Sequence, residues 1–124
     1  MLGTSRLVAF AATTNFVVAR DFYRDKLGLT LVSETPFAFE FESPGGLLRV
    51  TKVEAVLVAP YTTLGWCVEN IASTVEALTG RGVQFERYSG MTQDPRGIWR
   101  SPGGAQIAWF KDPDGNLLSL TQPA

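Results

Sequence analysis

The sequence contains no histidine, and its single cysteine is Cys67. Without histidine the chain cannot form a Ser-His-Asp or Cys-His catalytic arrangement, a histidine proton shuttle or a His-rich zinc site. Any catalysis must therefore use carboxylates, arginine, lysine, tyrosine or Cys67. A single cysteine also excludes a disulfide within the chain, and the apolar neighbours Leu64, Trp66 and Val68 predict a buried, unreactive thiol.

The chain also lacks an excess of either charge, since 11 Lys and Arg residues oppose 12 Asp and Glu residues. The basic residues are scattered, so no patch favours nucleic acid or an anionic membrane as a partner. No apolar run approaches the roughly 18 residues of a membrane span, and residues 1–6 do not resemble a secretion signal. We therefore expect a cytoplasmic protein that binds neither nucleic acid nor membrane.

The 124 residues, 45% hydrophobic and 19% charged, suit one folded domain, residues 1–124, or two small halves sharing a core. In the first half, Asn15 is a good helix N-cap, and apolar residues recur at helical spacing from Phe16 to Leu27. Gly28 is a natural stop for this helix. Strands are predicted for residues 7–12, 29–33, 37–42 and 47–53.

The second half repeats this order. Asn70 caps a predicted helix whose apolar stripe is Ile71, Val75 and Leu78 and which ends at residues 80–82. The segment Asp-Pro-Asp-Gly-Asn at 112–116 predicts a turn, because it lacks the acidic residue that closes a calcium loop. Strands are predicted for residues 63–68, 83–88, 105–110 and 117–121. The layout is thus βαβββ written twice, with modules at about residues 5–55 and 61–122.

Several short motifs occur along this layout: Phe22-Tyr23, Leu27-Gly28-Leu29, the strand 64–68 before a helix, Gly82-Val83, and the segment 110–117 with its Asp-Pro-Asp-Gly-Asn turn. Together they resemble the vicinal oxygen chelate superfamily, which contains glyoxalases, bleomycin-resistance proteins and extradiol dioxygenases. The resemblance implies an α+β fold in which two βαβββ modules form a curved, partly open mixed β-barrel around a central pocket. It also implies a homodimer.

Enzymes of that superfamily hold a divalent metal with His, Glu or Gln at four strand positions. By the resemblance, these positions are Val8 and Arg49 in the first module and Thr63 and Ser119 in the second. An apolar side chain, two hydroxyls and a guanidinium do not form the ligand shell that nickel, zinc, iron or manganese requires. We therefore expect no metal and no other cofactor.

Strand alternation predicts which side chains line the pocket. If Val8 faces it, so does Phe10, and Thr63 brings Gly65 to the same side. The hairpin at residues 43–46 pairs Glu40 with Arg49, so both should face the pocket, whereas Phe37, Phe39 and Phe41 should face the helices. The predicted ligand-binding residues are Val8, Phe10, Glu40, Arg49, Thr63, Gly65, Trp99 and Ser119.

The three tryptophans have different predicted places. Trp66 and Trp109 are expected on the helix-facing side, as core residues. Trp99 follows Asp94-Pro95-Arg96-Gly97-Ile98 in a predicted long loop, where it either covers the pocket mouth as a stacking lid, anchors the loop, or fills a dimer interface.

Three functions are compatible with these patterns. The leading hypothesis is a metal-free protein that binds a small, mostly apolar or aromatic organic molecule. The second is a cofactorless lyase or isomerase acting on a small carbonyl compound, with Arg49 as electrophile and Glu40 as base, unless this pair is an ordinary cross-strand ion pair. The third is a dimeric interaction module with a vestigial pocket.

Overall fold

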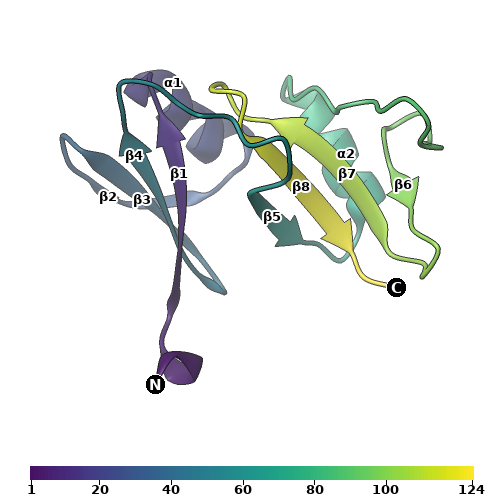
Figure 1. Ribbon diagram of the computed structural model, residues 1–124, viewed down its shortest axis with the longest axis horizontal. Helices are drawn as coiled ribbons and strands as arrows, with labels where there is room; N and C mark the ends of the chain where they lie inside the picture. Colours follow the sequence, from purple (N-terminus) through teal and green to yellow (C-terminus); the bar gives the residue numbers. More distant parts are fainter. The chain divides into compact units, whose positions relative to one another are not determined.

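The computed structural model describes all of residues 1–124, which divide into two compact units, Met1–Leu57 and Val58–Ala124 (Figure 1). Each unit contains one four-stranded mixed sheet and a helix, which confirms the predicted α+β class and the repeated βαβββ order. No helix combines the length and the hydropathy that crossing a bilayer requires.

The first unit has its strands in the order β1-β4-β3-β2, with β1 parallel to β4 and the remaining pairs antiparallel. The chain begins with a 3-10 turn, Leu2–Thr4, and α1 passes directly into a π-helical turn, Phe22–Lys26. The main elements are β1 (Leu7–Thr13), α1 (Phe16–Asp21), β2 (Thr30–Glu34), β3 (Ala38–Ser43) and β4 (Gly46–Lys52).

The second unit repeats this topology in the order β5-β8-β7-β6, again with one parallel pair, β5 and β8. The strands β7 and β8 form the hairpin predicted around the turn at 112–116, where the Asp112 carboxylate accepts hydrogen bonds from the backbone N–H groups of Asp114 and Asn116. The elements are β5 (Leu64–Cys67), α2 (Ile71–Gly80), β6 (Trp99–Arg100), β7 (Gln106–Lys111) and β8 (Leu117–Gln122).

Both helices begin as predicted. The Asn15 side chain accepts a hydrogen bond from the Val18 N–H at 3.3 Å, and Asn70 accepts one from the Ser73 N–H at 3.0 Å. Each bond satisfies a donor that the first helical turn leaves without a partner. The first helical segment also ends as predicted, at Gly28 with φ 75°.

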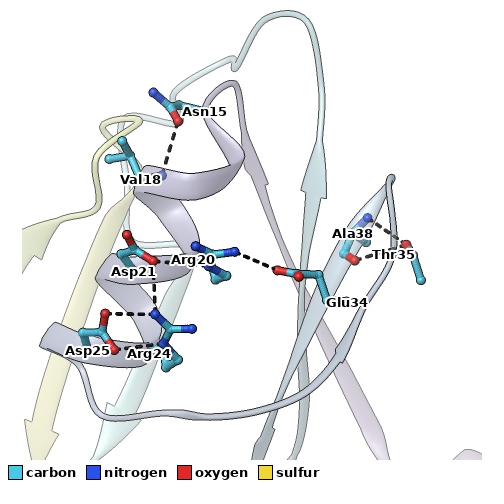
Figure 2. Close-up of polar contacts among 9 residues, drawn as sticks. All are labelled: Asn15, Val18, Arg20, Asp21, Arg24, Asp25, Glu34, Thr35 and Ala38. Carbon is cyan, nitrogen blue, oxygen red and sulfur yellow. Dashed lines mark hydrogen bonds and ion pairs between the residues drawn. The ribbon is translucent and has the colours of Figure 1, made fainter.

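Ion pairs connect the first helix to the sheet edge beside it. Figure 2 shows Arg20 of α1 donating to Glu34 of β2 at 3.3 Å, while Arg24 donates to Asp21 and Asp25 on its own helical segment. The hydrogen bond from Arg24 lowers the pKa of the Asp25 carboxyl. These contacts are exposed, so we assign them a positioning role and little stability.

Each sheet buries one face against its helix. In the first unit, Phe16 and Tyr23 from the helical segment pack on Phe39 and Phe41, with ring centroids 4.6 and 5.9 Å apart. In the second unit, the buried side of α2 covers the side of the sheet that carries Ala108, Phe110, Leu118 and Leu120, all of which are buried. We call the opposite side of each sheet its open face.

Two predictions about local structure are wrong. Residues 83–88 do not form a strand, because Phe85 makes only an isolated bridge to Phe110. The strand that pairs with β7 on the side away from β8 is the short strand β6. Phe37 is not a core residue, since it is 77% exposed in the turn before β3. The Thr35 hydroxyl closes that turn by donating to the Ala38 carbonyl and accepting from the Ala38 N–H group (Figure 2). It also accepts from the Phe37 N–H group.

Candidate functional site

The open face of the first sheet carries the predicted charged pair. Strand pairing places Glu40 opposite Arg49, and Phe10 on β1 opposite Arg49 on its other side, so all three share this face. The prediction of a cross-strand Glu40–Arg49 pair is therefore confirmed. Other residues with the same orientation are Val8, Leu47, Thr51 and Ala38.

The Arg49 guanidinium is held on two sides. Its Nε and Nη2 atoms donate to one oxygen of Glu40, Oε2, at 2.9 and 2.7 Å, and its Cζ lies 5.5 Å from the centroid of the Phe10 ring. Charge-assisted hydrogen bonds and a cation–π contact both restrain the side chain. The Arg49 side chain is nevertheless 41% exposed, against 21% for Glu40, so the cation is the more accessible member of the pair.

A hollow of about 470 Å³ lies over this pair. Two exposed aromatic rings line it. Phe10 of β1 is 61% exposed, and Phe37 lies in the turn before β3. A β-bulge between Leu31 and Ser33 shifts the register of β2, which places Ser33 opposite Glu40 and on the wall of the same hollow. Phe37 and Ser33 were missed at the sequence level, since bulges and turn conformations change strand alternation without a clear signal.

The four positions that the resemblance assigns to metal ligands do not fit a metal. Val8 offers no donor atom, Arg49 is a cation already paired with Glu40, and the Thr63 hydroxyl donates to the Leu117 carbonyl at 3.4 Å. Ser119 supplies a single hydroxyl, and an alanine Cβ at Gly65 would lie 2.6 Å from that oxygen. Neutral hydroxyls and a guanidinium are poor ligands for divalent metals, so these residues do not fit such an ion.

The open face of the second sheet carries an aromatic cluster that corrects the prediction for Trp109. Trp109 pairs with Ser119, which pairs with Gly65, so Trp109 lies on the open face instead of in the core. The pairing across the 112–116 turn is the signal that would have placed it there. Trp66 does lie on the helix side as predicted, since it pairs with Leu120 and stacks on Phe110 at 6.4 Å.

Trp99 and Tyr88 complete this cluster. Trp99 belongs to strand β6, not to a loop as predicted, and its ring centroid is 6.1 Å from that of Trp109. The Tyr88 ring meets Trp109 edge-on at 5.5 Å. Trp99 therefore takes part in an aromatic cluster with defined strand pairing, and its role as a lid or an interface residue stays a prediction.

The side chain of Gln93 organises the irregular segment where a strand was predicted. Its amide nitrogen donates to the carbonyls of Glu86 and Gly97 at 2.9 and 2.8 Å, and its oxygen accepts from the Tyr88 N–H at 2.8 Å. These bonds satisfy backbone groups that a strand neighbour would otherwise satisfy. Gln93 thereby positions Tyr88 beside Trp109.

The prediction of a buried Cys67 is wrong, because this residue is exposed. Cys67 pairs with Thr121 and lies two residues from Gly65, so its side chain emerges on the open face of β5, the edge strand. Its apolar neighbour Trp66 points to the opposite side. Successive side chains of a strand point to opposite faces of the sheet, so the residues on either side of Cys67 do not indicate its environment.

Tyr88 should titrate at unusually high pH. Burial raises the pKa of the Tyr88 phenol above its ordinary value of 10.0, and the negative charge of Glu86 adds to this effect while Lys111 opposes it. The stability that this group contributes is therefore fully present below about pH 10 and is lost as pH rises through the raised pKa. Absorbance at 295 nm of the native protein minus that of Tyr88→Phe should show a midpoint above 10; a midpoint at or below 10 would contradict the assignment.

Comparison with known proteins places this chain in a family. Residues 9–120 match the Glyoxalase/Bleomycin resistance protein/Dioxygenase superfamily. A glyoxalase/bleomycin resistance protein/dioxygenase from Nocardioides is 25% identical with a TM-score of 0.70, over 95% of this chain and 82% of that one. No curated protein sequence gives a significant match.

Two more distant structures share the fold. Lactoylglutathione lyase from Agrobacterium tumefaciens is 16% identical with a TM-score of 0.74, over 96% of this chain and 93% of that chain. TioX from Micromonospora is 17% identical with a TM-score of 0.73, over 97% and 99% respectively. Because the family match covers most of the sequence, this chain belongs to the glyoxalase/bleomycin resistance protein/dioxygenase superfamily.

Proposed function

We propose that this protein binds a small, mostly apolar or aromatic organic molecule without a metal ion, using the hollow on the open face of its first sheet. The observation that carries the proposal is the Arg49 guanidinium, which is paired with Glu40 and lies over Phe10 at a position where the resemblance implies a metal ligand. The hollow of about 470 Å³ has the size of a small-molecule site, and its lining combines two aromatic rings with the Glu40–Arg49 pair and three hydroxyl side chains. The proposal retains the cytoplasmic homodimer expected from the sequence.

The Glu40–Arg49 pair also favours a second candidate function. The two N–H donors of Arg49 both engage Oε2 of Glu40, while Oε1 accepts no hydrogen bond in its unit. A carboxylate oxygen beside a cation is the arrangement that a cofactorless lyase or isomerase needs to remove a proton next to a carbonyl group. Glu40 would be the base and Arg49 the stabiliser of the resulting enolate.

Elemental analysis and ligand-observed NMR test the first proposal together. We expect the purified protein to hold far less than one nickel, zinc, iron or manganese per chain, and to bind members of a library of neutral and charged aromatic fragments equally well with and without EDTA. Phe10→Ala should weaken this binding by about fivefold, the scale of one aromatic stacking contact. Val17→Ala, which removes a similarly exposed apolar side chain on α1, is the matched control and should change nothing.

Each alternative has a distinct outcome in the same experiments. Stoichiometric metal would contradict the metal-free proposal, and a complete absence of fragment binding would contradict ligand binding and leave the interaction module. Turnover of a carbonyl compound that Glu40→Gln abolishes would favour the cofactorless enzyme.

A further inference from the structure

The donors that Arg49 keeps free point to a particular ligand class. We infer that the hollow on the open face of the first sheet selects flat aromatic carboxylates over neutral and cationic aromatic molecules of the same shape. The inference rests on the proposed function, because it names the ligand class of the same hollow. Three observations carry it: the unused edge of the Arg49 guanidinium, its fixed orientation, and the two aromatic walls.

The first observation concerns the two edges of the guanidinium. A guanidinium presents five N–H groups, and a carboxylate can bind either along the Nε–Nη2 edge or along the Nη1–Nη2 edge. Glu40 occupies only the first edge, at 2.9 and 2.7 Å. Nη1 donates to no group in its unit, so the second edge retains a pair of donors with the spacing of carboxylate oxygens.

The second observation is that this edge is already oriented. Glu40 holds one edge of the guanidinium, and the guanidinium carbon lies over the Phe10 ring. Arg49 therefore loses less side-chain entropy when a ligand binds than a mobile arginine would. A carboxylate on the second edge would share Nη2 with Glu40, each anion accepting from a different N–H group of that nitrogen. Glu40 is therefore a positioning residue for the cation, and Arg49 is the residue that contacts the ligand.

The third observation is the pair of exposed rings that line the same hollow as Arg49. Phe10 and Phe37 are 61% and 77% exposed, and both line the hollow. Flat rings are the natural partners of such walls, because offset and edge-on contacts gain energy beyond simple burial. A ligand that joins one anionic group to a flat ring, an aromatic acid, matches this combination of the Arg49 cation and two aromatic walls.

The opposite selectivity, for an organic cation, would require Glu40 to be the accessible group. Its side chain is 21% exposed, half as exposed as that of Arg49, and one of its oxygens already accepts two hydrogen bonds. The more accessible charge of the pair in the hollow is therefore positive.

Three naphthalene probes of the same shape test this selectivity by isothermal titration at pH 7: 2-naphthoate, 2-naphthamide and 2-naphthylmethylammonium. We expect the carboxylate to bind at least roughly tenfold more tightly than the amide, the scale of a hydrogen-bonded charge. Arg49→Gln should remove this preference, and Arg49→Lys should retain part of it because the charge stays while the planar fork is lost. Arg6→Gln breaks the exposed Arg6–Glu42 pair on the same sheet and, as the matched control, should leave the preference intact.

The outcomes separate this inference from the proposed function. Equal binding of carboxylate and amide, unchanged in Arg49→Gln, overturns the carboxylate selectivity and leaves small-molecule binding in place. Tighter binding of the ammonium probe that Glu40→Gln abolishes overturns it in favour of an organic cation. Binding of none of the three probes overturns it too, and the broader fragment library then decides whether the proposed function stands. Circular dichroism of each variant verifies that a lost preference does not reflect unfolding.

Discussion

Replacing Gly46 with alanine should destabilise the first unit by about 3 kcal/mol or more. Gly46 begins β4 directly opposite Leu7 of β1, with φ 156°, a conformation that residues with a side chain rarely adopt. An added Cβ would collide with the Leu7 carbonyl oxygen and lie 2.9 Å from the Leu7 carbonyl carbon. Because both obstacles are backbone atoms, relief requires β1 and β4 to separate. Urea denaturation followed by far-UV circular dichroism measures the loss.

The adjacent glycine provides the control for this prediction. A Cβ at Gly45 meets nothing within 4 Å, and the backbone there is not in the positive-φ region. Gly45→Ala should therefore be neutral or stabilise the protein by up to about 1 kcal/mol, since alanine reduces the entropy of the unfolded chain. Equal unfolding midpoints for the two variants would show that the close approach of β1 to β4 is not a constraint on this position.

Replacing Phe39 with alanine should cost about 3–5 kcal/mol, the range for removing a large buried aromatic side chain. Phe39 of β3 is fully buried on the side of the sheet that faces the helix. Its ring centroid lies 4.6 Å from that of Phe16 and 5.5 Å from that of Phe41. A small unit has little stability in reserve, so this loss is expected to remove most of it. The midpoint of urea denaturation should fall accordingly.

Phe37 supplies the matched control two residues away. The same substitution removes a ring that is 77% exposed, so Phe37→Ala should change the free energy of unfolding by no more than about 0.5 kcal/mol. If Phe37→Ala were as damaging as Phe39→Ala, the exposed position of Phe37 and its place on the wall of the hollow would both be wrong.

The sequence predicts features that depend on local chemistry. Both helix caps, Asn15 and Asn70, are confirmed because a side-chain oxygen before a helix acts on N–H groups only three residues away. The pairing of Glu40 with Arg49 is confirmed because a short turn fixes the register of its hairpin. The α+β class follows from the order of such elements, and the family follows from the resemblance of short motifs such as the Asp-Pro-Asp-Gly-Asn turn.

The wrong predictions concern features that depend on distant contacts. The segment 83–88 has the composition of a strand, but Gln93 satisfies its backbone groups and the sheet neighbour comes from Trp99–Arg100. The prediction for Trp109 names the wrong face, because alternation along one strand does not include the pairing of Trp109 with Ser119 across the turn. Exposure of Cys67 and Phe37 depends on which neighbours cover them, and local composition does not contain that information.

The uneven distribution of tryptophan gives the two units different optical signatures. Trp66, Trp99 and Trp109 all lie within Val58–Ala124, and Met1–Leu57 contains none. Indole fluorescence therefore reports on the second unit alone, whereas far-UV circular dichroism reports on both. Comparing the two signals in one denaturation experiment separates loss of the Arg49 hollow from loss of the Trp109 cluster, without any label or truncated fragment.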